Sequence, residues 1–306
     1  MLFTTAGQIT DNLYVFGPSE YRIYFYDAPL AALFEGGVTC FGKVYQQAIN
    51  DIISPRQPQM LFLTHGHWDH CGAASYLKKA FPDLKIAASA QTAQIQKRPH
   101  AVKLISELNS ETAVVVAAGG EFKHSDLLPQ PFTEFRVDLE LQEGDRIELG
   151  PGITVQVMAT PGHTRDHLCY YIPEQRTLMA GEAAGLLFPS GFNSCEFISD
   201  YEQYLASLER LAALPIDILC QGHFLVVMGR EDVKTFFQRS IQATQSLRDV
   251  IYRLLDEEHG SVENTVLRMK SLFYDPKPHP KQPAKAYLLN ASAQAAHLAA
   301  RRQTVS

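Results

Sequence analysis

The feature that most restricts the fold of this chain is a ten-residue stretch, 63–72, that reads LTHGHWDHCG. It follows the apolar run MLFL, which predicts a buried strand, and it contains His65, His67, Asp69 and His70. In an extended loop alternate residues point the same way, so His65 and His67 can face one metal ion. Asp69 and His70 follow where the chain turns into a helix, and they can reach a second ion. The stretch therefore predicts a loop at a strand end that serves two metals.

Three further predicted strands end in polar groups. MATPGHT supplies His163, TLMAGE supplies Glu182 and DILCQGH supplies His223. Because ligand sites in sheet proteins commonly gather at strand ends, we expect these side chains to meet the histidine loop at one rim. Imidazole and carboxylate ligands without thiolate suit zinc, iron(II) or manganese. Two such divalent ions would lie about 3.5 to 4 Å apart and acidify a water molecule bridging them.

The spacing of hydrophobic residues changes near residue 226. Before it, short apolar strands alternate with helices, including a helical stretch at 91–118 and a strand at 133–141. The later strands predict a mainly antiparallel sheet, followed by a helix with a capping-box pattern of Ser199 and Glu202. After it, helices are expected at 232–258, 261–273 and 284–302. We expect 1–226 to form a catalytic domain and 227–306 a helical extension that packs on it and covers the site.

Composition excludes several classes of partner. With 306 residues, 46% of them hydrophobic and 20% charged, the chain can bury a core through most of its length. A net charge of -6 supplies no broad basic face for nucleic acid. Five widely spaced cysteines without a C-x-x-C pair indicate reduced thiols, and no stretch has the length of a bilayer span. We therefore expect a cytoplasmic protein with a small-molecule substrate, no membrane partner, and C-terminal helices available for homo-oligomer contacts.

Four short sequence motifs occur in this order and carry a family resemblance: HGHWDH, TPGHTRDH, AGE and QGH. Together they resemble the metallo-β-lactamase-fold hydrolases, particularly the glyoxalase II-like branch, over about residues 5–226. The resemblance implies an α/β (α+β) fold, a four-layer αββα sandwich, with a dinuclear site between the edges of its sheets. It implies one ligand group for the first metal, one for the second and a bridging carboxylate at Glu182. The first group is His65, His67 and His163; the second is Asp69, His70 and His223.

A second resemblance rests on fewer and less specific sequence motifs. EGG before the first helix, THGHWDHCG and the helical extension also resemble the quinolone-signal response thioesterase type. That resemblance implies an enclosed site under C-terminal helices, and action through partner binding as well as hydrolysis.

Two positions depart from the family pattern. The family has aspartate where this chain has Glu182, and the extra methylene leaves three outcomes: a bridge with altered geometry, a bond to one ion only, or a weakened second site. We favour a retained dinuclear site because every other ligand is present. At LFEGG many members have an aspartate before the glycine, so Glu35 either supports a ligand, packs in the core or simply lies at a strand end.

Other residues near the motifs can have either a structural or a functional role. Metal-bound imidazoles usually need a partner on their other nitrogen, so Asp166 and His167 are candidates for that part, against a loop cap and a buried strand histidine. We expect Trp68 to pack against the first strands and Cys71 to be a small buried residue. The remaining histidines are interpreted as ordinary surface or core residues: His100, His124, His259, His279 and His297.

The main functional hypothesis is hydrolysis of an ester-like bond, with thioesters first, then carboxylic esters or lactones. A hydroxide bridging two metal ions attacks the carbonyl, and Asp69 orients it and takes its proton. Two alternatives stay open. One is a metal-stabilised regulatory or partner-binding protein with little turnover; the other is a mononuclear iron persulfide oxygenase.

Overall fold

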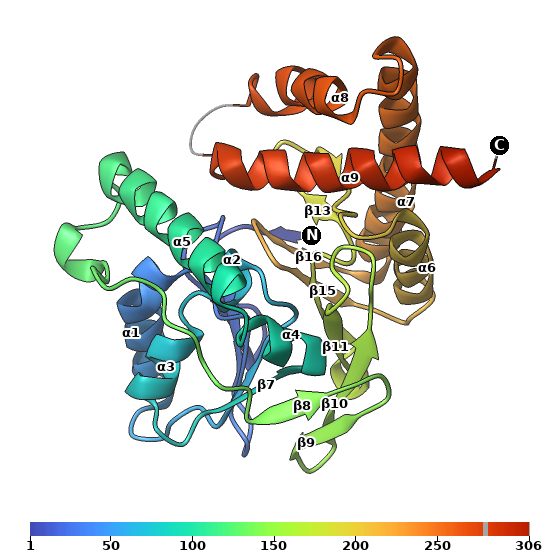
Figure 1. The fold of residues 1–306 in the computed structure, drawn as a ribbon. Coiled ribbons are helices and arrows are strands. Elements are labelled where there is room, and N and C mark those ends of the chain that lie inside the picture. The colour runs from blue at the N-terminus through green and yellow to red at the C-terminus, as the bar shows by residue number, and fades with distance from the viewer. Residues whose placement is uncertain (278–280, 306) are drawn as a thin grey trace.

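Two facing sheets form the centre of the molecule in the computed structural model, which describes residues 1–277 and 281–305 (Figure 1). The first sheet has seven strands in sequence order; β2 to β5 pair antiparallel and β5 to β8 pair parallel. Its strands are β2 Gly7–Gln8, β3 Leu13–Phe16, β4 Ile23–Tyr26, β5 Ala32–Phe34, β6 Met60–Phe62, β7 Lys85–Ser89 and β8 Leu139–Leu141.

The second sheet also has seven strands, in the order β1-β16-β15-β12-β11-β10-β9. Its strands are β1 Leu2–Phe3, β9 Arg146–Gly150, β10 Ile153–Ala159, β11 Leu168–Ile172, β12 Thr177–Gly181, β15 Ile218–Gln221 and β16 Val226–Met228. All neighbours pair antiparallel except β12 and β15, so the expected antiparallel sheet contains one parallel pair. A small hairpin, β13 Leu186–Leu187 and β14 Asn193–Ser194, lies outside both sheets.

Helices cover the outer face of each sheet (Figure 1). They are α1 Gly42–Ile53, α2 Trp68–Cys71, α3 Ala74–Ala80, α4 Ala90–Ile95, α5 Pro99–Gly119, α6 Tyr201–Ala212, α7 Arg230–Glu257, α8 Val262–Met269 and α9 Ala284–Val305. Short 3-10 turns span Thr39–Phe41, His124–Asp126 and Pro173–Gln175, and a π turn spans Lys270–Tyr274.

Three separate apolar cores define four layers. One core lies between the first sheet and α1, α3 and α5, where Leu33 and Tyr45 are buried. A second lies between the two sheets and includes Phe62 and Tyr170. A third lies between the second sheet and α6 to α9, where Phe237 is buried. The αββα sandwich with added C-terminal helices is therefore confirmed. Strands β6 and β11 read as continuous apolar runs because both of their faces are covered.

Local chemistry explains where the helices near the site begin and end. Pro99 occupies the first turn of α5, where its missing N–H costs nothing, and Gly120 ends the helix in a left-handed conformation with φ of 70°. The capping box expected at α6 is wrong by one residue. Asp200 is the N-cap and accepts from the Gln203 N–H, while the Ser199 hydroxyl donates to the Gly162 carbonyl. The Ser199 hydroxyl is engaged by the Gly162 carbonyl, so the cap is supplied by the next residue, Asp200.

Two other expectations are modified in the first half of the chain. The strand expected at 133–141 is reduced to β8, because residues 131–137 have no regular structure. The helical stretch at 91–118 is confirmed as α4 and α5, which shows that its β-branched residues follow the helical pattern around them.

The C-terminal helices pack on one another and on the second sheet. α9 contacts α7 and α8, and Lys285 on α9 forms an ion pair with Glu107 on α5. In Figure 1 the red α9 crosses the upper part of the molecule, and the green α5 lies below its left-hand end. No helix among residues 1–277 and 281–305 is long and apolar enough to cross a lipid bilayer.

Candidate metal centre

The polar strand ends identified from the sequence meet at one place. The loop after β6 and the short helix α2 carry four of the side chains, and the ends of β10, β12 and β15 carry the other three. Within each group the candidate ligand atoms lie no more than 4.8 Å apart. The first group is His65, His67, His163 and Glu182; the second is Asp69, His70 and His223.

The Glu182 carboxylate joins the two groups. Its Oε2 lies 2.7 Å from His163 Nε2 and 3.6 Å from His65 Nε2 in the first group. The same oxygen lies 3.5 Å from His70 Nε2, and Oε1 lies 3.4 Å from His223 Nε2, both in the second group. The added methylene of glutamate has therefore not carried the carboxylate away from either group.

The donor set fits divalent metal ions. A tetrahedral zinc site with Zn–N bonds of 2.0–2.1 Å has ligand atoms about 3.3 Å apart. Comparable separations join His163 Nε2 to His67 Nδ1, 3.2 Å, and His223 Nε2 to Asp69 Oδ2, 3.7 Å. The Nε2 atoms of His65 and His70 are buried, and neither has a hydrogen-bond partner among the described residues. Buried polar atoms are rarely left unsatisfied, so these two nitrogens are available to bind a metal ion.

The charges of the site also call for cations. Burial alone would raise the pKa of Glu182, but His163, with His223 and His70, holds it well below its ordinary value. Burial by itself would lower the pKa of His70, His163 and His223, yet the neighbouring carboxylates outweigh burial and raise the pKa of these three imidazoles. Burial and the facing His163 lower the pKa of His67 to about 4, which keeps that imidazole neutral. The carboxylate thus holds positive charge beside it, as bound metal ions would supply.

Backbone carbonyls fix the orientation of two ligands. His163 Nδ1 donates to the Glu196 carbonyl and His223 Nδ1 donates to the Glu20 carbonyl, each at 2.5 Å. Donation from Nδ1 leaves the Nε2 lone pair free and directed into the site. Neither carbonyl was identified from the sequence, because a backbone acceptor carries no side-chain signature.

Glu35 supports one ligand of each group. It lies at the end of β5, is 2% exposed and adopts a φ of 70°. Its Oε1 accepts from the Thr64 hydroxyl at 2.7 Å and lies 3.2 Å from His70 Nδ1. Thr64 Oγ1 in turn lies 3.0 Å from His65 Nδ1, which can donate to it. Of the three readings of Glu35, contact with the ligand histidines is the one realised, and Thr64 is a supporting residue that the sequence reasoning missed.

Asp166 and His167 hold the site without touching the free nitrogen of a ligand. Asp166 Oδ2 accepts from the Gly66 N–H at 2.8 Å and from the Thr92 hydroxyl at 2.7 Å, so it fixes the turn between two ligands. His167 Nε2 accepts from the Glu182 N–H at 3.3 Å, and its Nδ1 lies 2.8 Å from Thr160 Oγ1. Both residues therefore hold backbone in place, and the His167 ring also stacks on the His65 imidazole, with 4.9 Å between the ring centroids.

The remaining residues near the motif are structural. Trp68 packs edge-on against Tyr21 at 5.9 Å between ring centroids and also lines the cavity described below, and Cys71 is fully buried. Of the histidines set aside, those at 100, 124 and 259 are exposed and His279 lies outside the described residues. His297 Nε2 accepts from the Tyr201 N–H at 3.0 Å.

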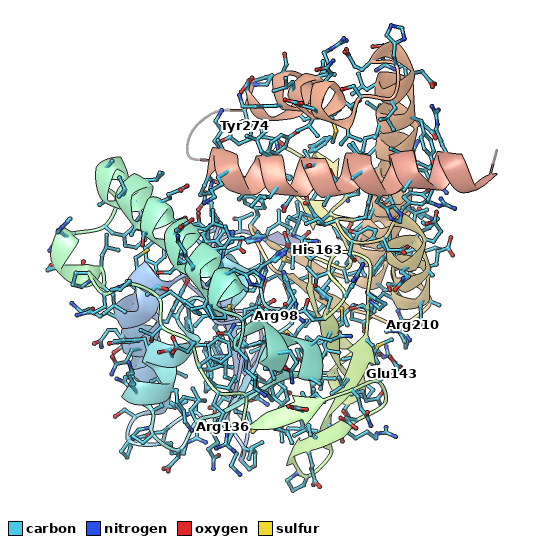
Figure 2. All side chains as sticks on the ribbon, viewed as in Figure 1. Arg98, Arg136, Glu143, His163, Arg210 and Tyr274 are labelled. Carbon is cyan, nitrogen blue, oxygen red and sulfur yellow. The ribbon has the colours of Figure 1, made fainter. Side chains whose placement is uncertain are left out.

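A cavity of about 1740 Å³ opens onto the candidate ligands. Its wall includes His67, Asp69, His163, Glu182 and His223, together with residues of α5, α9 and the segment 188–192. Figure 2 shows His163 beneath α9, where the strand ends of the second sheet approach the helices. The site can therefore take a molecule much larger than water.

The αββα fold and the arrangement of the candidate ligands are typical of metal-dependent hydrolases. A family model that matches the sequence identifies the family. The model of the metallo-beta-lactamase superfamily matches residues 41–223, which is more than half of the chain. The chain therefore belongs to the metallo-beta-lactamase superfamily.

Particular relatives are more distant. A hydroxyacylglutathione hydrolase of Rhodopseudomonas palustris is 31% identical over 61% of this chain and 59% of its own length. One from Yersinia enterocolitica is 25% identical over 60% of this chain and 59% of its own length. An atrochrysone carboxyl ACP thioesterase of Aspergillus fumigatus is 24% identical over 60% and 43%. The chain thus spans less than two thirds of the length of these relatives.

Solved structures agree on the fold. A metallo-beta-lactamase family protein from Thermus thermophilus superimposes with a TM-score of 0.64 at 18% identity, covering 100% of this chain and 93% of its own. A beta-lactamase domain protein from Burkholderia ambifaria gives 0.66 at 15% identity, covering 99% and 92%. At this identity the likeness concerns the fold alone.

Proposed function

We propose that this protein is a metal-dependent hydrolase of ester-like bonds, with thioesters as its principal substrates. The observation that carries the proposal is the Glu182 carboxylate, which lies within 3.6 Å of histidines from two ligand groups on the wall of a large cavity. Relatives named as a hydroxyacylglutathione hydrolase and an ACP thioesterase support the choice of thioester.

The residues assigned to the metals are those predicted from the motifs. His65, His67 and His163 would hold the first ion; Asp69, His70 and His223 would hold the second, with Glu182 between them. Divalent ions of zinc, iron or manganese, when bound, supply an activated water molecule and polarise the substrate carbonyl.

The chain's own residues supply orientation and proton transfer. Asp69 faces the cavity, so its carboxylate can orient the attacking water and accept its proton. The carbonyls that hold His163 and His223 keep those imidazoles in one tautomer.

We propose further that residues 1–226 act as the catalytic domain and 227–306 as its cover. Support comes from the cavity, whose wall includes Ala286 and Leu289 on α9 as well as the candidate ligands. The oxygenase alternative needs an open mononuclear site, whereas this chain offers a second group of three ligand side chains.

Thioester turnover measured together with metal content tests the proposal. In a His67→Ala variant we expect bound metal and hydrolysis of an activated thioester to fall together. His100→Ala is a matched control, because His100 is an exposed histidine on α5. Unchanged turnover by His67→Ala with its metal content retained would overturn the proposal. A wild type with full metal and no turnover across thioesters and esters would favour the regulatory alternative.

A further inference from the structure

A row of phenylalanine rings leads from a candidate metal ligand to the surface. Phe224 directly follows His223, with 6.0 Å between the ring centroids. Phe188 follows at 4.4 Å from Phe224, and Phe192 at 6.0 Å from Phe188. All three phenylalanines line the cavity, and Phe192 is 60% exposed. The row therefore forms a continuous aromatic wall between the reacting centre and solvent.

The backbone holds this wall in place at a conformational cost. Phe224 adopts a φ of 66°, a left-handed conformation that a bulky residue rarely takes. Its N–H donates to the Ser19 carbonyl at 2.5 Å, which ties it to the loop between β3 and β4. Strain at such a residue persists only when its surroundings enforce it, and it is concentrated at functional sites. The ring of Phe224 thus has a fixed place beside His223.

The opposite wall of the cavity is also apolar. α5 contributes Ile105, Leu108 and Val116 to it, and α9 contributes Leu289 and Ala293. Leu289 is 46% exposed, like Phe192 far more than an interior residue. Large apolar groups on different elements therefore remain partly in solvent around one opening, the arrangement expected of a ligand groove.

Most charged residues of the cavity belong to the candidate metal centre or to loops, and Lys277 lies against the aromatic wall, with its Nζ 5.3 Å from the centroid of the Phe188 ring. Asp69 and Glu182 belong to the metal centre, and Asp166 is engaged by Gly66 and Thr92. The other charged lining residues are in loops or at helix ends: Glu20, Arg98, Glu121, Arg165, Glu196, Lys277 and Lys281. The surface between the aromatic wall and α5 is therefore mainly apolar, with Thr112 as a polar side chain from α5.

We propose that this cavity selects thioesters with a large apolar acyl group, and that Phe188, Phe192 and Phe224 determine that specificity. The inference rests on the proposed function, because it assigns the acyl side of the same substrate. Each methylene that enters an apolar cavity contributes about fourfold to the binding equilibrium. kcat/KM should therefore rise along a series of straight-chain acyl groups until the cavity is filled.

Hydrolysis of N-acetylcysteamine thioesters bearing acetyl, butanoyl, hexanoyl, octanoyl and lactoyl groups measures this preference. We expect kcat/KM to increase by about fourfold per methylene from butanoyl upward, and lactoyl to be poor. Phe188→Ala should flatten the series and lower the octanoyl-to-butanoyl ratio by about tenfold. Phe192→Ser makes the same test at an exposed position where folding is not at risk. Val114→Ser is the control, since Val114 is 70% exposed on α5 and does not line the cavity.

Binding of non-hydrolysable ligands separates this inference from the proposed function. The chain has one tryptophan, Trp68, and it lines the cavity, so its fluorescence reports occupancy. We expect the Kd of S-alkyl thioether analogues of N-acetylcysteamine to fall with chain length, and Phe188→Ala to reduce that dependence. If binding follows chain length while no thioester is hydrolysed, the proposed function fails and the apolar cavity stands. A Kd and a kcat/KM that do not change with chain length would overturn the inference, even with rapid metal-dependent hydrolysis.

Discussion

Replacing Glu35 with glutamine removes one buried negative charge that contacts both ligand groups while preserving the shape of the side chain. Its Oε1 now accepts from the Thr64 hydroxyl and lies 3.2 Å from His70 Nδ1. Through Thr64 the same carboxylate reaches His65, at 3.0 Å from the threonine oxygen. In Glu35→Gln the neutral amide can still accept from Thr64, but it no longer places a negative charge beside His70 Nδ1, which orients that imidazole and makes it a stronger metal ligand.

The loss should appear in metal affinity. Removing a side chain that orients a metal ligand typically costs 10–100-fold in affinity, or about 1.4 to 2.7 kcal/mol. We expect Glu35→Gln to weaken zinc by about that factor at the group that contains His70, with a smaller effect at the group that contains His65. Competition against a chromophoric chelator gives the two affinities separately. Thermal unfolding of the metal-free proteins checks that the fold is intact.

Thr64→Val is the matched variant, because it removes the hydroxyl between Glu35 and His65 and leaves the contact between Glu35 and His70. It should weaken the first group more than the second, which is the reverse of Glu35→Gln. Two zinc affinities in Glu35→Gln equal to those of the wild type would refute the assigned role. The same result in Thr64→Val would limit that role to His70.

Three other outcomes are expected. A Cβ at Gly162, where φ is 129°, would lie 2.2 Å from the Tyr204 backbone, so Gly162→Ala should lower the free energy of unfolding by about 3 kcal/mol in urea titrations. Gly152→Ala, which meets nothing within 4 Å, should cost about 1 kcal/mol; equal losses would contradict the contact. Burial raises the pKa of Cys40 and Cys169 to about 12, so at pH 8 about 10⁻⁴ of each is thiolate. Ellman's reagent should find no fast thiol in the native protein and all 5 after denaturation; a fast native thiol would refute this. The raised pKa of His70, His163 and His223 favours their protonated forms in the folded metal-free protein. The stability that this contributes is fully present below pH 6.5 and is lost as the pH rises through their pKa values in the folded state. Zinc must displace these protons, so it should bind more tightly at pH 8 than at pH 6 and release protons in calorimetry; tighter binding at pH 6 would contradict the assignment.

The seven candidate ligands were identified from the sequence because each lies in a short motif that directly follows an apolar strand. These strands belong to both sheets, β6 to the first and β10, β12 and β15 to the second, and their ends meet at one rim of the sandwich, as expected of a ligand site at strand ends. The position of Glu182 was harder to predict, since an added methylene leaves its carboxylate several directions. Packing around the β12 end decided among them.

Other parts of the site depend on contacts that no local pattern encodes. Glu35 and Thr64 belong to neighbouring strands, β5 and the end of β6, and their hydrogen bond follows from strand order. The aromatic wall joins Phe224, after one strand, to a hairpin at 186–194 that the sequence reasoning did not assign. The cap of α6 moved from Ser199 to Asp200 because Ser199 bonds to a distant loop. Tertiary contacts overrode local preference in each case.

Metal stoichiometry tests the central claim most directly. Elemental mass spectrometry on protein purified without added metal, followed by stepwise zinc, iron(II) or manganese addition to the metal-free protein, counts the ions per chain. Thioester hydrolysis is measured at each step. We predict two ions per chain and activity that reaches its maximum only when both are bound. One ion per chain with full activity, or activity that is unchanged after complete metal removal, would contradict a dinuclear hydrolase centre.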